Sequence, residues 1–296
     1  MRHFILGTDW WTDCDDAVAL RLLARFVKEG RAALLGVAIN ACMEESAASL
    51  SGFLASEGLG SVPIGIDLSA TDYGGNPPYQ KRLAEELGRG ISNRDLPDAV
   101  RLYRQILADA EGEIEIIEIG FLQVLSAVLE SGGDEISPLC GLELVKQKVK
   151  KIWIMAGKWD ADGERENNFC RNARARLSGN RVCALCPVPI TFLGWEVGHG
   201  VLTGGELDRA DRLYRILSDH GSEHGRHSWD PMLVLLALIG DEAAAGYDTV
   251  TGTASVDPDS GANHFLPNAR GLHKFVVKTR DDAYYAREIN RLLETP

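Results

Sequence analysis

The chain of 296 residues lacks any apolar run long enough to cross a membrane, because a spanning helix needs about 20 consecutive apolar residues. It also lacks a basic run: Lys and Arg number 31 against 43 Asp and Glu, which gives a net charge of −12. An acidic chain without basic clusters argues against nucleic acid or a membrane surface as a partner. The first residues lack the apolar segment of a signal peptide. We therefore expect a cytoplasmic protein.

Cysteine is also scarce, with six residues in the whole chain, too few for a disulfide scaffold at this length. Cys183 and Cys186 form one C-x-x-C pair, but no second pair completes a zinc site. We interpret these two residues as reduced side chains of a buried strand.

Short β-rich runs alternate with amphipathic helical segments along the chain. The expected strands cover residues 3–8, 33–39, 62–66, 114–119, 151–155 and 181–185. The expected helices cover residues 16–28, 44–57, 99–110, 122–130, 143–148 and 173–177. Nearly continuous apolar strands are typical of strands covered on both faces. The pattern predicts an α/β fold: a mostly parallel, doubly wound open sheet with helices on both faces, in one domain over residues 1–296.

The most informative stretch follows the first expected strand, where four carboxylates fall within eight residues: Asp9, Asp13, Asp15 and Asp16. Ionised carboxylates this close repel one another and are costly to bury, so a compensating charge is required. A hard cation such as Ca²⁺ or Mg²⁺ prefers oxygen ligands and would supply that charge. The alternative is an acidic helix cap with a solvated first turn.

Other polar residues follow later strands, at the carboxyl edge where doubly wound sheets bind ligands. Asn40 follows the second expected strand, Glu166, Asn167 and Asn168 follow the fifth, and Asp230 opens an apolar helix. Each has an ordinary alternative: a turn residue for Asn40, a solvated loop charge for Glu166, and helix caps for Asn168 and Asp230. Together they are the hydroxyl-binding types that a sugar requires. We therefore expect the active site at this edge.

Several motifs occur in a characteristic order. They are Thr8-Asp9 through Asp15-Asp16-Ala17, Asn40, Ile119-Gly120-Phe121-Leu122, Met155-Ala156-Gly157, Glu166-Asn167-Asn168-Phe169, Pro189-Ile190-Thr191-Phe192 with Gly194 and Glu196, and Ser228-Trp229-Asp230-Pro231. In these motifs the chain resembles the calcium-dependent nucleoside hydrolases, the inosine-uridine-preferring nucleoside ribohydrolase family. The likeness covers most of the chain, and it implies hydrolysis of the N-glycosidic bond of a ribonucleoside to free base and ribose.

The resemblance also implies a Ca²⁺ ion, held by Asp9, Asp16, Asp230 and the backbone carbonyl of Ile119. A water and two ribose hydroxyls would complete its coordination. In that arrangement Asp9 deprotonates the metal-bound water, which attacks the anomeric carbon as the base departs. Relatives commonly form dimers or tetramers, so a homo-oligomer is expected.

Further residues match family positions that hydrogen-bond the sugar: Asp15, Asn40, Glu166 and Asn168. The role of Asp13 stays open, since it could contact the ribose, bind an outer water or face solvent.

The chain departs from the family pattern at three positions. Trp11 stands where related sequences carry Gly, and Asn167 stands where many have Phe against the ribose. Trp229 replaces a His that can protonate the departing base, and Trp cannot donate that proton. Either His227, or another residue of segment 220–227, substitutes for it, or the base is activated by stacking on Trp229. We interpret the histidines of this segment as solvated lid residues rather than as a transition-metal site.

The tryptophan pair and a Gly- and Pro-rich segment each allow two structural interpretations. Trp10 and Trp11 could stack on a nucleobase at the pocket mouth or pack under the sheet edge. The Gly- and Pro-rich segment 71–79 is either a flap that brings Tyr73 or Tyr79 to the base, or an ordinary surface loop.

Two alternative functions compete with hydrolysis of a ribonucleoside. A binding protein could keep calcium and a ribosyl ligand without efficient hydrolysis, which the three departures make credible. A phosphatase with Asp9 as nucleophile, of the haloacid-dehalogenase type, would need a second Asp where this chain has Trp11, so we reject it. Base preference, turnover and oligomeric state are not encoded in these patterns.

Overall fold

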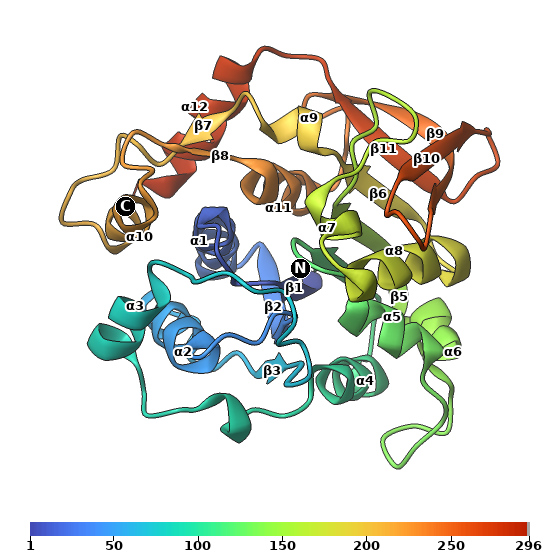
Figure 1. Ribbon diagram of the computed structural model, residues 1–296, viewed down its shortest axis with the longest axis horizontal. Helices are drawn as coiled ribbons and strands as arrows, with labels where there is room; N and C mark the ends of the chain where they lie inside the picture. Colours follow the sequence, from blue (N-terminus) through green and yellow to red (C-terminus); the bar gives the residue numbers. More distant parts are fainter. Residues whose placement is uncertain (295–296) are drawn as a thin grey trace.

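A nine-stranded sheet organises the computed structural model, which describes residues 1–294 (Figure 1). The strand order is β10-β9-β11-β6-β5-β4-β1-β2-β3. Neighbouring strands from β3 through β11 run parallel, whereas β9 pairs antiparallel with both β11 and β10. The strands are β1 (Arg2–Thr8), β2 (Ala32–Ile39), β3 (Ile64–Ile66), β4 (Ile114–Glu118), β5 (Val149–Met155), β6 (Ile190–Leu193), β9 (Tyr247–Val256), β10 (Asn263–Pro267) and β11 (His273–Lys278).

Helices cover both faces of this sheet, as Figure 1 shows. One layer contains α1 (Asp15–Lys28), α2 (Ser46–Ser56), α10 (Arg212–His220), α11 (Trp229–Ile239) and α12 (Asp282–Leu293). The other contains α4 (Ala99–Asp109), α5 (Gln123–Glu130), α6 (Gly141–Lys148) and α8 (Ala173–Leu185). The smaller elements are α3 (Gln80–Leu87), η1 (Asn93–Asp95), α7 (Asn167–Cys170), α9 (Trp195–Gly198) and the hairpin of β7 (Leu202–Thr203) with β8 (Arg226–His227).

Two apolar cores follow from this layering. Successive side chains of a strand point to opposite faces, and in β1 Phe4 and Leu6 join one core while Ile5 joins the other. Strands buried on both faces explain the continuous apolar runs of the sequence. The predicted α/β fold, with a mostly parallel sheet and helices on both faces, is confirmed. Among the described residues, we find no helix with both the length and the apolar character needed to cross a bilayer.

One predicted strand is wrong. Residues 181–185 belong to α8, which begins well before them and carries Cys183 on its buried side. Asn172 caps this helix by accepting a hydrogen bond from the Ala175 amide at 2.9 Å, and Val182 and Cys183 continue the apolar stripe. A five-residue β-prone run is too short to distinguish a strand from the end of a helix. The sixth strand lies further on, at β6, and all six cysteines are free.

Candidate functional site

An open pocket lies at the carboxyl ends of β1, β4 and β5, with about 800 Å³ of open space. Its walls are formed by Asp9, Trp11, Thr12, Asp13, Asp15, Asp16, Ile119, Met155, Glu166, Asn167, Asn168, Arg171, Trp195, Trp229 and Asp230. The pocket therefore collects residues from six separate segments of the chain at the sheet edge where ligands of doubly wound folds bind.

Buried carboxylates form the floor of this pocket. Asp9 follows β1 directly, Asp15 and Asp16 occupy the first turn of α1, and Asp230 occupies the first turn of α11. Oxygens of Asp15, Asp16 and Asp230 lie within 4.8 Å of one another, and the Asp230 amide donates to Asp15 at 3.1 Å. The Thr8 hydroxyl donates to Asp16. All four carboxylates are at most 7% exposed.

The electrostatics of the floor favour a cation. Burial, followed by the charges of Asp16 and Asp15, raises the pKa of Asp9 well above its usual value. Burial and the same pair of neighbours likewise raise the pKa of Asp230. Burial raises the pKa of Asp16 to about 7, even though Thr8 donates to it. Each shift records the cost of holding an anion here without a counter-charge. An all-oxygen set of this kind fits a hard divalent cation.

A single glycine permits the close approach of the strand ends. A Cβ on Gly120 would lie 2.8 Å from the Asp9 Cβ and 2.9 Å from the Asn40 Oδ1. Gly120 thereby allows the segment that follows β4, which includes Ile119, to lie close against Asp9. Asn40 does not line the pocket: it is fully buried behind the wall, where its Oδ1 accepts from the Phe121 amide at 3.1 Å. Its Nδ2 has no hydrogen-bond partner within residues 1–294.

Glu166 and Asn168 shape another wall. Glu166 caps α7, accepting from the amides of Asn168 and Gly157 at 3.0 Å. Burial outweighs these hydrogen bonds and raises the pKa of Glu166 to about 7. The Asn168 Nδ2 donates to the Met155 carbonyl at 2.9 Å, which fixes its side chain. Asn167 lines the pocket as well, with its residue exposed.

Asp13 is held in an ion pair. Its carboxylate accepts from Arg226 Nε at 2.8 Å and from Nη2 at 2.5 Å. Although burial acts in the other direction, this hydrogen bonding and charge lower the pKa of Asp13. The ion pair shows that Asp13 is not simply a solvated carboxylate, and Asp13 also lines the pocket, so contact with the ribose or with an outer water stays a prediction. His220 and Cys14 complete a possible ligand group with Asp13, but burial raises the pKa of the Cys14 thiol, which opposes metal binding as a thiolate.

Trp10 and Trp11 lie in different surroundings, and only Trp10 packs away from the pocket. Trp10 has a positive φ of 41° and is fully buried against Phe53 and Tyr79, with ring centroids at 5.5 and 5.3 Å. Trp11 lines the pocket and contacts Phe121.

The segment 71–79 does not bring an aromatic ring to the pocket. Tyr73 stacks on Phe121 at 3.8 Å, its hydroxyl donates to Gln123, and Tyr79 is fully buried. Neither tyrosine lines the pocket, which favours the reading as a packed surface loop.

A tryptophan that the sequence reasoning missed forms part of the wall. Trp195 follows β6 and lies beside Trp229, with ring centroids 6.3 Å apart and planes at 29°. The Trp229 Nε1 donates to the Trp195 carbonyl at 2.8 Å. Its signal was present, since Trp195 is the aromatic residue between the family motif positions Gly194 and Glu196.

His227 does not line the pocket. Its ring stacks on His199 at 4.7 Å and lies 5.2 Å from the ring of Trp229. Burial and the neighbouring Arg226 lower the pKa of His227. Trp229 thus occupies the wall, and His227 lies in the aromatic group beside it.

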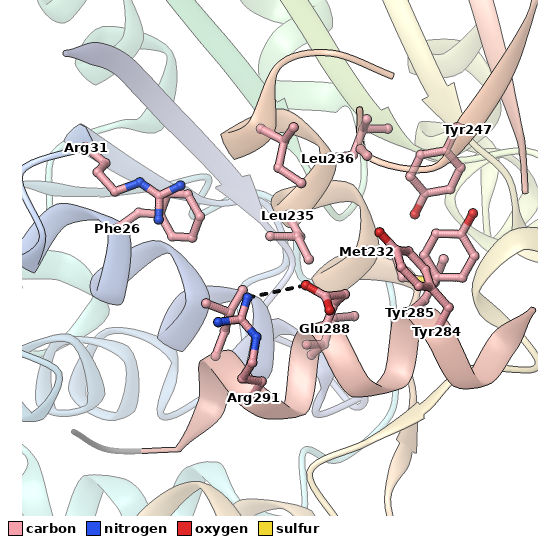
Figure 2. Close-up of a pocket in the computed structure, with 14 residues that line it drawn as sticks. Phe26, Arg31, Met232, Leu235, Leu236, Tyr247, Tyr284, Tyr285, Glu288 and Arg291 are labelled. Atoms are coloured by element: carbon pink, nitrogen blue, oxygen red, sulfur yellow. Dashed lines mark hydrogen bonds and ion pairs between the residues drawn. The ribbon is translucent and has the colours of Figure 1, made fainter. Parts of the chain in front are cut away.

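A second pocket lies elsewhere, between α1, α11 and α12 (Figure 2). Its wall is largely apolar and aromatic, with Met232, Leu236 and Tyr247 among its residues. At its rim Arg31 lies over the Phe26 ring at 3.8 Å, and Arg291 pairs with Glu288 at 3.3 Å. This pocket contains no carboxylate cluster among the described residues.

Fold and site together define an α/β protein with an acidic, oxygen-rich pocket at the carboxyl edge of its sheet. Neither a protein-family model nor a curated protein sequence matches the chain. Solved structures do match it. A plant nucleoside hydrolase superposes with a TM-score of 0.76 at 18% identity, covering 100% of this chain and 99% of that one.

Two further structures match over nearly the full length. The inosine-uridine-preferring nucleoside hydrolase from Bacillus anthracis gives a TM-score of 0.72 at 15% identity, covering 99% of each chain. The type III effector protein XopQ, solved with adenosine diphosphate ribose, gives 0.68 at 16% identity, covering 99% of this chain and 93% of that one. The chain has the fold of the nucleoside hydrolases, and the resemblance drawn from its motifs is confirmed at this level.

Proposed function

We propose that this protein is a divergent nucleoside hydrolase that uses calcium to hydrolyse the N-glycosidic bond of a ribonucleoside, releasing base and ribose. The observation that carries the proposal is the buried cluster of Asp9, Asp15, Asp16 and Asp230 at the carboxyl edge of the sheet. A fold gains no stability from unpaired buried carboxylates, so their presence supports a bound cation.

Asp9, Asp16, Asp230 and the Ile119 carbonyl are the proposed ligands, and Asp15 lies close enough to share in the set. A calcium ion bound there would lower the pKa of a coordinated water and hold two ribose hydroxyls. The Asp9 carboxylate, whose pKa is raised, is the proposed acceptor of a proton from the attacking water.

The chain's other polar residues act on the sugar. Breaking an N-glycosidic bond builds positive charge on the ribose ring, as in other glycoside hydrolyses. In their ionised forms, Asp15 and Glu166 would place negative charge beside the ring without rearrangement, which is the arrangement that lowers such a barrier most. Asn168 would donate to or accept from a ribose hydroxyl. Asn40 acts behind the wall, where it supports the Ile119–Phe121 segment.

The leaving base would lie against aromatic surface. Trp229 and Trp195 both line the pocket, whereas His227 does not. This supports activation of the base by stacking rather than protonation by His227, and it makes Trp229 a substrate-binding residue.

A second candidate function is binding of a ribosyl ligand without efficient hydrolysis. It is favoured by the absence of a protonating residue from the wall at Trp229 and by the pairing of Asp13 with Arg226. The effector with the same fold, solved with adenosine diphosphate ribose, fits this reading too. Cytoplasmic location and a dimer or tetramer stay predictions.

Release of reducing sugar from a panel of ribonucleosides, with and without chelator, tests the proposal. We expect calcium-dependent release, and turnover of inosine at least about 10²-fold above that of 2′-deoxyinosine, because the deoxy sugar leaves polar groups unpaired. Calcium-dependent thermal stabilisation without release of base would support the binding protein instead. Comparable turnover of inosine and deoxyinosine would contradict the proposal that the site binds both hydroxyls of the ribose diol.

A further inference from the structure

One cation lines the otherwise acidic pocket. The other ionisable side chains of the wall are six carboxyl groups: Asp9, Asp13, Asp15, Asp16, Glu166 and Asp230. Arg171, directly after α7, is the exception. A cation among carboxylates is expected to pair with one of them unless it is held for another purpose.

Arg171 is held by backbone and aromatic contacts instead. Its Nε and Nη2 donate to the Tyr73 carbonyl at 3.1 and 2.9 Å, and its guanidinium lies 4.6 Å from the Trp11 ring centroid. It forms no ion pair within residues 1–294, and its Nη1 donates to no acceptor there. The nearby Arg174 differs, since it pairs with Asp72 at 3.1 Å and does not line the pocket.

Two uncharged donors lie on the same part of the wall. Thr12 adjoins Trp11 and borders Gly75, while Arg171 borders Gly74, so both flank one turn of the chain. Asn167 precedes Arg171 by one helical turn, and the Arg171 amide donates to its carbonyl at 3.0 Å. In the part of the chain that the structure describes, neither the Thr12 hydroxyl nor the Asn167 side chain makes a hydrogen bond. The rim therefore offers donors that have no partner among the described residues, whereas the floor offers acceptors.

We propose that Arg171, with Thr12 and Asn167, forms an oxyanion subsite, and that the preferred substrate is an anionic N-riboside. The inference rests on the proposed function and names its substrate class. A planar guanidinium matches the oxygens of phosphate or carboxylate and can hold two of them at once. The anion is either a 5′-phosphate on the ribose or a carboxylate on the base, and both present the same oxygens to Arg171.

The test compares kcat/KM for uridine, uridine 5′-monophosphate and orotidine in three proteins: the unaltered chain, Arg171→Gln and Arg174→Gln. We expect the unaltered protein to prefer one anionic substrate over uridine. Arg171→Gln should lower that preference ratio about 10- to 100-fold, the range for hydrogen bonds to a charged group, and Arg174→Gln should leave it unchanged. Preference for the monophosphate would identify a 5′-phosphate as the anion that Arg171 binds, and preference for orotidine would identify a carboxylate on the base.

A binding measurement separates this inference from the proposed function. Calorimetric titration of the calcium-loaded protein with ribose, ribose 5-phosphate and orotate does not depend on hydrolysis. If an anion binds through Arg171 but no riboside is cleaved, the subsite stands and hydrolysis fails. If uridine is cleaved and neither anionic substrate has a higher kcat/KM than uridine, the proposed hydrolysis is supported and the oxyanion subsite is overturned. The subsite is equally overturned if no anion binds, or if the preference ratio is the same in Arg171→Gln.

Discussion

The two pockets of this protein differ in the free energy of burying the side chains that form their walls. The pocket between α1, α11 and α12 is lined by apolar and aromatic side chains, and its charged residues are paired at the rim (Figure 2). Burying such residues is favourable. The pocket at the sheet edge instead buries Asp9, Asp15, Asp16 and Asp230 with raised pKa values. Packing explains the first pocket, whereas the second requires a function.

Replacing a floor carboxylate should give the largest loss of activity. Asp9→Asn keeps the shape of the side chain but removes the proton acceptor and one charge. We expect kcat to fall by about 10²- to 10⁴-fold, the usual contribution of a general base. Steady-state kinetics with a saturating ribonucleoside would measure it. A variant with more than a tenth of the original kcat would contradict the role of Asp9.

Calcium should stabilise the protein more at high pH than at low pH. Asp16 has a folded pKa of about 7 against an ordinary value of 3.8, so its contribution to stability is fully present below about pH 4 and is lost as pH rises through about 7. A shift of this size corresponds to at most about 4 kcal/mol. Calcium removes the penalty by binding the anions.

Thermal unfolding of metal-free and calcium-loaded protein at about pH 5 and about pH 8 measures this difference. The metal-free protein should lose stability toward pH 8, and the calcium-induced rise in Tm should be larger there. An equal rise at both values would mean that the ion does not bind these carboxylates.

The apolar pocket should respond in stability alone. Ile289 of α12 lines this pocket and is fully buried, so Ile289→Ala should lower the free energy of unfolding by about 2–5 kcal/mol. Denaturant titration measures that loss, and kcat/KM of the folded protein should stay within about twofold, since α12 contributes no residue to the wall of the acidic pocket. A large kinetic defect would show that the two pockets are coupled.

The aromatic wall should give the smallest effect of the four. Trp229→Ala removes a stacking surface worth about 1–3 kcal/mol per base, so kcat/KM should fall by roughly 5- to 150-fold. His227→Gln is the matched variant, because its ring lies in the same aromatic group but not on the pocket wall. We expect less than a tenfold loss for it. A larger loss in His227→Gln than in Trp229→Ala would restore His227 as the proton donor to the base.

The sequence predicted much of the fold because strands buried on both faces leave continuous apolar runs that alternate with amphipathic helices. It failed at residues 181–185, where helix capping by Asn172 and packing of α8 decided the structure. It also did not predict β6, β9, β10 or β11, which complete the sheet beyond β5.

Much of the candidate pocket was equally predictable, since Asp9 follows a strand directly and Asp15, Asp16 and Asp230 lie in the first turns of helices at the same edge of the sheet. The missing parts depend on contacts between distant segments. Arg226 pairs with Asp13 across 213 residues of sequence, and Arg171 lies against the Tyr73 carbonyl from 98 residues away. No local pattern encodes such a pairing.

The amino-acid sequence by itself determined that acidic side chains lie at the ends of strands. Both the strand pattern and the close spacing of carboxylates can be recognised from neighbouring residues. Only the tertiary structure decided which neighbouring side chains face the pocket. Trp10 and Trp11 are chemically equal in the sequence, yet the positive φ of Trp10 accompanies its burial in the core while Trp11 lines the wall. The direction of a side chain in a loop depends on the backbone path, and distant packing sets that path.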